Sequence, residues 1–341
     1  MALSREERLQ LAAMDPELTE YLKTAHIPQV DSSDPSRVIA GLRLYMKGLY
    51  KSPDPESGVV ERDIFFSARD GFQLRAHIYE PTDKSTTARP LVVYYHGGGW
   101  TIGSPEDTAR HCRQIVQKLG AICVAPSYRQ GPEDPFPASI NDAWDALLWL
   151  ASHAESEIGV SLSQGFVVGG SSAGGNMSAV LSHRARDEGL TSAITGLFLL
   201  APSILPPGTI VSLPEKYKEM YLSRTQKECQ KDPVLSPALQ KIFLDSAQGD
   251  EQSPMFVPFI WPTGHRGLPR TYFQVCGMDQ NRDESLIYEQ TLREDNGVET
   301  KLDLYPGMPH IFWGIFPMLT QGKKAAVDFE AGMRWLLQGS K

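Results

Sequence analysis

The chain has 341 residues, a formal net charge of −8 and an expected isoelectric point near 5.5. Its lysines and arginines form no cluster, so nucleic acid and anionic membrane surfaces are not expected as partners. No apolar run approaches the length of a membrane-spanning helix, and the charged start lacks the apolar centre of a secretion signal. We therefore expect a cytoplasmic protein without stable membrane insertion that acts on a small neutral molecule.

Residues 1–50 predict amphipathic cap helices, because apolar side chains recur there at roughly helical spacing before any strand begins. The polar segment 51–57, broken by two prolines, predicts a linker. Apolar runs then alternate with helical patterns, which is typical of a mostly parallel sheet flanked by helices. We predict one α/β core, residues 51–202 and 269–341, into which a proline-rich and aromatic cap insertion, residues 203–268, is placed.

Three glycines follow the predicted buried strand 91–95, in the sequence HGGGW at His96–Trp100. A glycine backbone can approach a ligand oxygen closely, and its amides can stabilise negative charge that develops on that oxygen. The alternative is a flexible connecting loop. Trp100 follows the glycines directly, so it either lines the substrate pocket, the role we assign to it, or braces the loop.

A second glycine motif, GSSAGG at Gly170–Gly175, lies between an apolar strand, residues 165–168, and a helical pattern from Asn176. A sharp turn of this kind holds a serine hydroxyl clear of its own backbone, where a base can remove its proton. Only Ser172 has glycines two residues before and after it, which makes it the candidate nucleophile and leaves Ser171 a poor one.

An acid and then a base should follow the serine along the chain, since this is the order of the α/β-hydrolase fold. Asp279 lies just after the predicted strand 271–277, and His310 lies on a proline- and glycine-rich loop after the predicted strand 300–305. We predict that Ser172, Asp279 and His310 form a catalytic triad.

Several residues compete with this assignment. Asp283 and Glu284 begin the next helix, where the helix dipole alone favours carboxylates. His96 ends a strand before the glycines, which suits a role in anchoring that loop. Of the remaining histidines, His77 lies within a strand pattern and His265 follows an irregular segment. The other four lie on patterns expected to be solvated; they are His26, His111, His153 and His183.

Together these motifs resemble the hormone-sensitive-lipase-like family of α/β-hydrolases, from about Asp63 to the C-terminus, with residues 128–138 (YRQGPEDPFPA) as a further matching motif. The resemblance implies an eight-stranded, mostly parallel sheet with a helical cap and carboxylesterase activity. It also implies that the amides of Gly98, Gly99 and Ala173 form the oxyanion hole, with Gly97 part of the same loop.

The chain departs from this family in two places. Family members usually carry an acidic residue where this chain has Ser171, and they continue the Tyr-Arg motif with Leu-Ala where this chain has Gln130-Gly131. Neither change removes a catalytic group, but the first leaves open how the turn at Ser172 is braced.

We expect hydrolysis of small carboxylic esters with short to medium acyl chains, through an acyl-enzyme on Ser172. One alternative keeps the triad but passes the acyl group to a nucleophile other than water, or releases or cyclises a product held as a thioester. It is suggested by residues 307–316, which resemble hydrolases of fungal natural-product pathways. A non-catalytic small-molecule receptor on the same scaffold is disfavoured by the presence of all three triad residues.

The sequence predicts neither a metal nor a cofactor, because it has no Cys/His cluster with zinc spacing and no phosphate-binding glycine loop. The four cysteines show no pairing motif, which fits a reducing compartment. The oligomeric state is left open, with a homodimer as one alternative.

Overall fold

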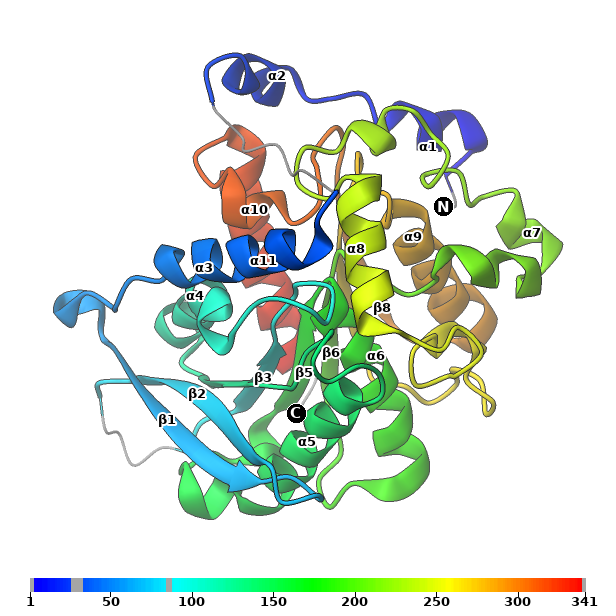
Figure 1. Ribbon diagram of the computed structural model, residues 1–341. Coiled ribbons are helices and arrows are strands. Elements are labelled where there is room, and N and C mark those ends of the chain that lie inside the picture. The colour runs from blue at the N-terminus through cyan, green and yellow to red at the C-terminus, as the bar shows by residue number, and fades with distance from the viewer. Residues whose placement is uncertain (1–2, 26–32, 84–87, 339–341) are drawn as a thin grey trace.

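A computed structural model describes residues 3–25, 33–83 and 88–338. Its centre is a sheet of eight strands in the order β1-β2-β4-β3-β5-β6-β7-β8, in which only β2 runs antiparallel to its neighbours (Figure 1). The predicted eight-stranded, mostly parallel sheet is therefore confirmed. The strands are β1 Val59–Ser67, β2 Gln73–Pro81, β3 Leu91–Tyr95, β4 Ile122–Pro126, β5 Phe166–Ser171, β6 Gly196–Leu200, β7 Thr271–Cys276 and β8 Thr300–Tyr305.

Helices cover both faces of the sheet. Along β3, Leu91 and Val93 belong to one apolar cluster while Val92 and Tyr94 belong to the other, as the two-residue period of a strand requires. None of the described helices is both long and apolar enough to cross a membrane. The first face is packed by α5 Ala138–Glu157, α6 Ala173–Arg184 and α9 Arg282–Gln290, and the second by α4 Ala109–Leu119 and α11 Thr320–Gln338.

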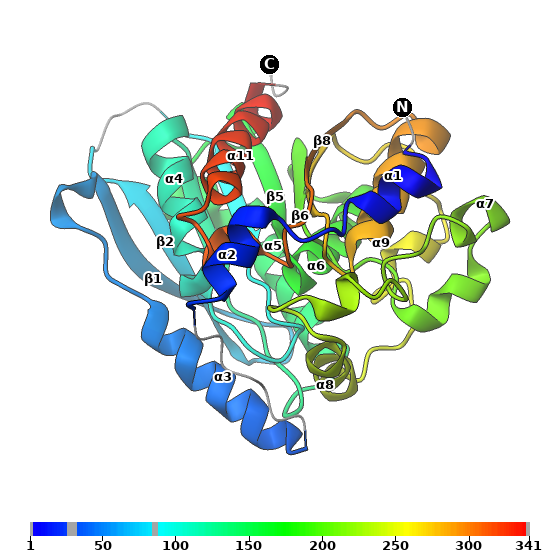
Figure 2. The same ribbon diagram turned by 90° about the horizontal axis from the view of Figure 1, so that it is seen from above.

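Further helices lie outside the two layers that cover the sheet, toward the carboxyl ends of the strands (Figure 2). Helix α1 lies beside α9 and α2 beside α10, and the carbonyl of Leu11 accepts a hydrogen bond from the amide of Gly307 at 2.7 Å. The N-terminal segment thus contacts the loop after β8 directly. The elements are α1 Arg5–Gln10, α2 Pro16–Leu22, α3 Pro35–Leu49, α7 Glu215–Lys218, α8 Pro237–Ala247 and α10 Phe312–Ile315.

Helix α3 is fastened to the core by one arginine. The Arg43 guanidinium donates to the carbonyls of Thr101 and Gly131, at 2.9 and 2.8 Å, and pairs with the Glu133 carboxylate at 2.8 Å. A guanidinium presents several donors in a fixed plane, which suits it to hold several acceptors at once. Arg43 therefore ties the chain after the glycine loop to the segment after β4.

The predicted solvation of His111 and His183 is wrong, because both side chains are buried. Helix α11 covers His111, where Phe329 stacks on its ring at 4.1 Å between centroids. The end of the cap insertion covers His183, where Trp261 stacks at 4.9 Å and His265 lies 2.9 Å from its Nε2. His153 is exposed, as predicted, and His26 lies outside the described residues.

The four cysteines are Cys112 on α4, Cys123 on β4, Cys229 in the cap insertion and Cys276 on β7. All four are buried and form no disulfide. Burial raises the pKa values of the Cys123 and Cys276 thiols well above the ordinary value of a thiol. It raises the pKa of Cys229 to about 12.

The first turn of α6 packs directly on the end of β3. A β-carbon at Gly174 would lie 2.0 Å from the Tyr95 carbonyl oxygen and 2.5 Å from the His96 carbonyl oxygen, so only glycine fits there. This contact between two main chains sets where the turn before α6 lies relative to the glycine loop that follows β3.

We expect Gly174→Ala to lower the free energy of unfolding by about 3 kcal/mol, because the added methyl forces α6 away from β3. Urea unfolding followed by circular dichroism measures the change. The control is Gly41→Ala in exposed α3, where a β-carbon meets nothing within 4 Å, and alanine should raise helix stability slightly. Equal stability of the two variants would contradict the packing argument.

Candidate active site

Ser172 lies at the turn between β5 and α6, with a left-handed φ of 53°. Its amide donates to the Leu200 carbonyl at 2.9 Å, and its own carbonyl accepts from the Asn176 amide at 3.0 Å. These bonds hold a non-glycine residue in a conformation that it rarely adopts, which is characteristic of a nucleophile elbow.

The structure brings the three predicted triad residues into one hydrogen-bonded chain. His310 Nε2 lies 2.9 Å from Ser172 Oγ, and His310 Nδ1 lies 2.6 Å from Asp279 Oδ2. All three side chains are buried. The second oxygen of Asp279 accepts a hydrogen bond from the Asn281 amide at 2.9 Å, which helps to hold the carboxylate in its orientation toward His310.

The competing carboxylates make other contacts. Asp283 accepts from the amides of Leu222 and Ser223, and Glu284 accepts from the amide of Leu205. Both lie in the first turn of α9, as expected, and both are fully buried. Neither hydrogen-bonds to a histidine, so only Asp279 is placed to orient His310.

The charge of Asp279 governs the protonation of His310. Burial alone lowers the pKa of the imidazole, but the neighbouring carboxylate and its hydrogen bond more than offset this, and the pKa lies above the ordinary value of 6.5. The imidazole therefore binds a proton more tightly than a free histidine does.

The glycine loop lies against the serine turn. A β-carbon at Gly97 would lie 3.3 Å from Ser172 Cβ, so the two loops touch beside the serine. No hydrogen bond among the described residues uses the amides of Gly98, Gly99 or Ala173. These three donors are therefore available to an oxygen bound beside Ser172 Oγ.

His96 anchors this loop, which agrees with its expected structural role. Its Nδ1 lies 2.7 Å from the Gly97 carbonyl oxygen, and the Tyr128 hydroxyl donates to the His96 carbonyl at 3.0 Å. Burial lowers the pKa of His96 to about 4, so the ring is neutral near pH 7. A neutral, buried ring without contact to Ser172 is not placed to act as its base.

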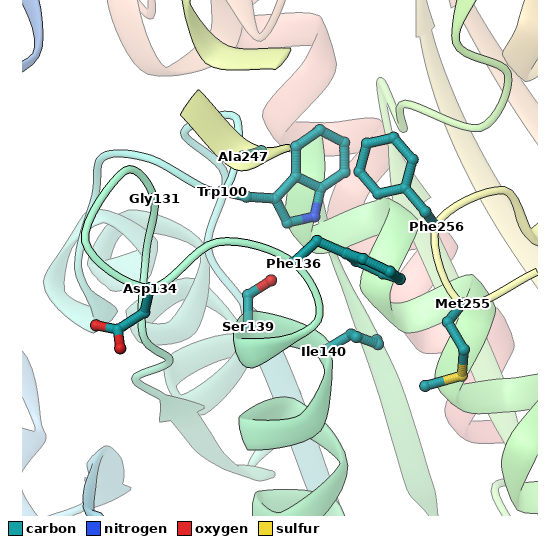
Figure 3. A pocket seen from close by; sticks show the side chains of 9 residues that line it. All are labelled: Trp100, Gly131, Asp134, Phe136, Ser139, Ile140, Ala247, Met255 and Phe256. Carbon is teal, nitrogen blue, oxygen red and sulfur yellow. The ribbon is translucent and has the colours of Figure 1, made fainter. Parts of the chain in front are cut away.

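Trp100 is almost fully buried and packs against Phe256 of the cap insertion at 4.9 Å between ring centroids. The two rings and Phe136 line a small cavity with room for about one water molecule (Figure 3). The remaining lining residues are Gly131, Asp134, Ser139, Ile140, Ala247 and Met255. Both roles weighed for Trp100 are thus compatible with its position, which is beside the glycine loop and on a cavity wall.

Ser171 faces away from Ser172 into a buried chain of polar groups. Its Oγ lies 2.6 Å from the Tyr94 hydroxyl, which lies 2.9 Å from His111 Nδ1. Burial lowers the pKa of His111 to about 3, so its neutral ring can accept the tyrosine proton while Tyr94 accepts that of Ser171. These hydrogen bonds fix the Ser171 side chain beside the turn that carries Ser172.

Sequence reasoning missed one side chain that touches the site. Asp232, in the cap insertion, accepts a hydrogen bond from the main-chain amide of His310 at 2.8 Å. Nothing in one sequence marks a carboxylate 78 residues from its partner, in a segment without regular periodicity. Among the described residues, no group of histidines, cysteines and carboxylates could hold a metal ion.

The sheet order, the serine turn after β5 and the triad contacts together define the α/β-hydrolase class of proteins. Comparison with known proteins places the chain within it: residues 92–314 match the alpha/beta hydrolase fold family, to which this chain belongs. The predicted likeness to hormone-sensitive-lipase-like carboxylesterases is confirmed by the relatives.

Three relatives illustrate the likeness. An AB hydrolase superfamily protein of Schizosaccharomyces pombe is 38% identical over 82% of this chain and 80% of its own. The versiconal hemiacetal acetate esterase of Dothistroma septosporum is 29% identical over 89% of this chain and 88% of its own. The crystal structure of vibralactone cyclase has a TM-score of 0.84 and 30% identity, over 97% of each chain.

Tyr94→Phe should lower the free energy of unfolding by about 1–3 kcal/mol, because it leaves the buried Ser171 hydroxyl and His111 ring without their shared partner. Thermal and urea unfolding measure this loss. Tyr45→Phe on α3, where the side chain is 59% exposed, removes the same atom and should change nothing. A Tyr94→Phe variant with the same free energy of unfolding as the wild type would show that the hydrogen bonds among Ser171, Tyr94 and His111 do not stabilise the turn.

Proposed function

We propose that the chain is a serine hydrolase that cleaves carboxylic esters of small substrates through an acyl-enzyme. The observation that carries this proposal is the continuous chain from Ser172 Oγ through His310 to Asp279, at 2.9 and 2.6 Å, beside three free backbone amides. This combination supplies a nucleophile, a base and a site for negative charge within one buried space.

In the proposed first step, His310 Nε2 removes the Ser172 proton as Oγ attacks the ester carbonyl carbon. The carbonyl oxygen takes up the negative charge and is stabilised by the amides of Gly98, Gly99 and Ala173. The imidazolium then gives its proton to the departing alcohol, which leaves an acyl group on Ser172. Asp279 keeps the imidazole in the required tautomer and stabilises its positive form.

In the second step, His310 deprotonates a water molecule that attacks the acyl carbon. The carboxylic acid departs and the proton returns to Ser172. We further propose that the described parts of the N-terminal segment, residues 3–25 and 33–50, form a lid over this site together with the cap insertion. Phe243 of α8 supports this, because a β-carbon at Gly99 would lie 2.5 Å from its ring.

In this proposal the favoured substrates carry short to medium acyl chains, as the likeness to hormone-sensitive-lipase-like carboxylesterases implies. The four free, buried thiols support a reducing compartment such as the cytoplasm.

The structural likeness to vibralactone cyclase supports a second candidate function. The same acyl-enzyme could pass its acyl group to a nucleophile within the substrate or to an acceptor other than water. Ser172 and His310 are deeply buried, so a bound substrate could exclude water from the acyl-enzyme. Exclusion of water favours acyl transfer or cyclisation over hydrolysis.

Ser172→Ala should reduce kcat for p-nitrophenyl esters by about 10⁵-fold or more, with the fold retained, because only binding and the oxyanion amides remain. Release of p-nitrophenol from acyl esters of increasing length measures this, and wild-type turnover should peak at short chains. Ser171→Ala, one residue away, should still form the acyl-enzyme. Near-normal hydrolysis by Ser172→Ala would refute the mechanism, whereas an acylated but non-turning wild type would favour acyl transfer or cyclisation.

The pH dependence follows from the raised pKa of His310. The base must be neutral, so kcat/KM should fall as the pH drops, with its midpoint above 6.5. Asp279→Asn removes the charge that raises this pKa, so the midpoint of the residual activity should move to lower pH and kcat should fall about 10⁴-fold. An unchanged midpoint in this variant would contradict the pairing of Asp279 with His310.

A further inference from the structure

Asp232 joins the cap insertion to the loop that carries His310. It lies between two helical segments of the insertion and is 2% exposed. Its Oδ1 accepts from the amides of Val234 and Leu235 at 2.7 and 3.0 Å, and its Oδ2 accepts from the amide of His310 at 2.8 Å. One carboxylate therefore fixes a turn of the insertion with one oxygen and the main chain of His310 with the other.

The position of that main chain decides the position of the imidazole. His310 follows a loop in which Gly307 has a left-handed φ of 69°, and it precedes Ile311, whose φ is 44°. Its ring must meet Ser172 and Asp279 at the same time, at 2.9 and 2.6 Å. A main-chain shift of about 1 Å would break one contact or the other, and displacements of this size typically cost about 100-fold in rate.

Asp232 also places a second negative charge beside the triad. The groups that interact with it are the Asp279 carboxylate, the His310 ring, and the thiols of Cys229 and Cys276. Burial, followed by the charge of Asp279, raises the pKa of Asp232 to about 6. A proton on Oδ2 would take the place of the hydrogen bond from His310.

We propose that Asp232 is a positioning residue of the hydrolase site. Through its hydrogen bond to the His310 amide, the cap insertion holds His310 in line with Ser172. This inference rests on the proposed function. It makes catalytic alignment depend on a segment that contributes no group to the triad. The expected signature is a loss in kcat rather than in substrate binding.

The decisive variant is Asp232→Asn. The amide oxygen can still accept from Val234 and Leu235, but its NH₂ group faces the His310 amide and cannot accept from it. The substitution also removes a buried charge whose ionisation burial disfavours, so the variant is expected to fold. We expect kcat for p-nitrophenyl acetate to fall roughly 10- to 100-fold with KM little changed.

The control is Asp245→Asn, which neutralises an exposed carboxylate of the same insertion that pairs with Lys241 at 2.7 Å. It should leave kcat, KM and the pH profile unchanged. Asp232→Glu keeps the charge and lengthens the side chain by one methylene, so it should lose kcat as well. Wild-type kcat in folded Asp232→Asn would overturn the proposal.

The wild type provides a test that needs no variant. If both Asp232 and His310 must be deprotonated, the plot of log kcat/KM against pH should steepen from a slope of one toward two below about pH 6. Asp232→Asn should restore a slope of one and move the acid limb to lower pH. An acid limb at the same pH in the wild type and in Asp232→Asn would contradict the contact between Asp232 and His310, because the Asp232 charge contributes to the raised pKa of His310.

The reaction of Ser172 with a fluorophosphonate separates failure of this inference from failure of the proposed function. If the wild type hydrolyses no ester but Ser172 still reacts with the fluorophosphonate, Asp232→Asn should slow that reaction roughly 10- to 100-fold, the factor expected for kcat. An equal reaction rate in the two proteins would exclude a positioning role whatever the substrate is.

Discussion

Close contact between the first turn of α6 and the end of β3 is the constraint on which the rest of the site depends. The missing side chain at Gly174 lets the helix main chain touch the carbonyl oxygens of Tyr95 and His96. This single approach brings the serine turn and the glycine loop together, although they are far apart in sequence. The oxyanion hole that we propose from the amides of Gly98, Gly99 and Ala173 depends on this close packing of the two loops.

The geometry of the site also depends on segments that contribute no triad residue. Leu11 hydrogen-bonds to Gly307 before His310, and Asp232 holds the His310 amide. Arg43 binds the chain just after the glycine loop and the segment after β4. Each contact joins a segment outside the sheet to a loop at the carboxyl ends of the strands. The sheet fixes the approximate positions of the loops, and these contacts determine their final ones.

Much of this architecture could be predicted because the information is local. A glycine-flanked serine between a strand and a helix needs only six adjacent residues to be recognised, and chain order then suggests Asp279 and His310. The burial of His111 and His183 was not predictable in this way, since Phe329 and Trp261 cover them from distant segments. Tyr94 and Asp232 escaped notice for the same reason: each acts on a partner that no periodicity or spacing connects to it.

The buried cysteines make the native protein a favourable background for site-specific labelling. Thiol reagents attack the exposed thiolate, and here all four thiols are enclosed, three of them with strongly raised pKa values. A single cysteine introduced at Val211, which is 75% exposed on the cap insertion, would therefore carry a fluorophore without prior removal of the natural thiols. Movement of the insertion during turnover can thus be observed in a chain whose core remains unaltered.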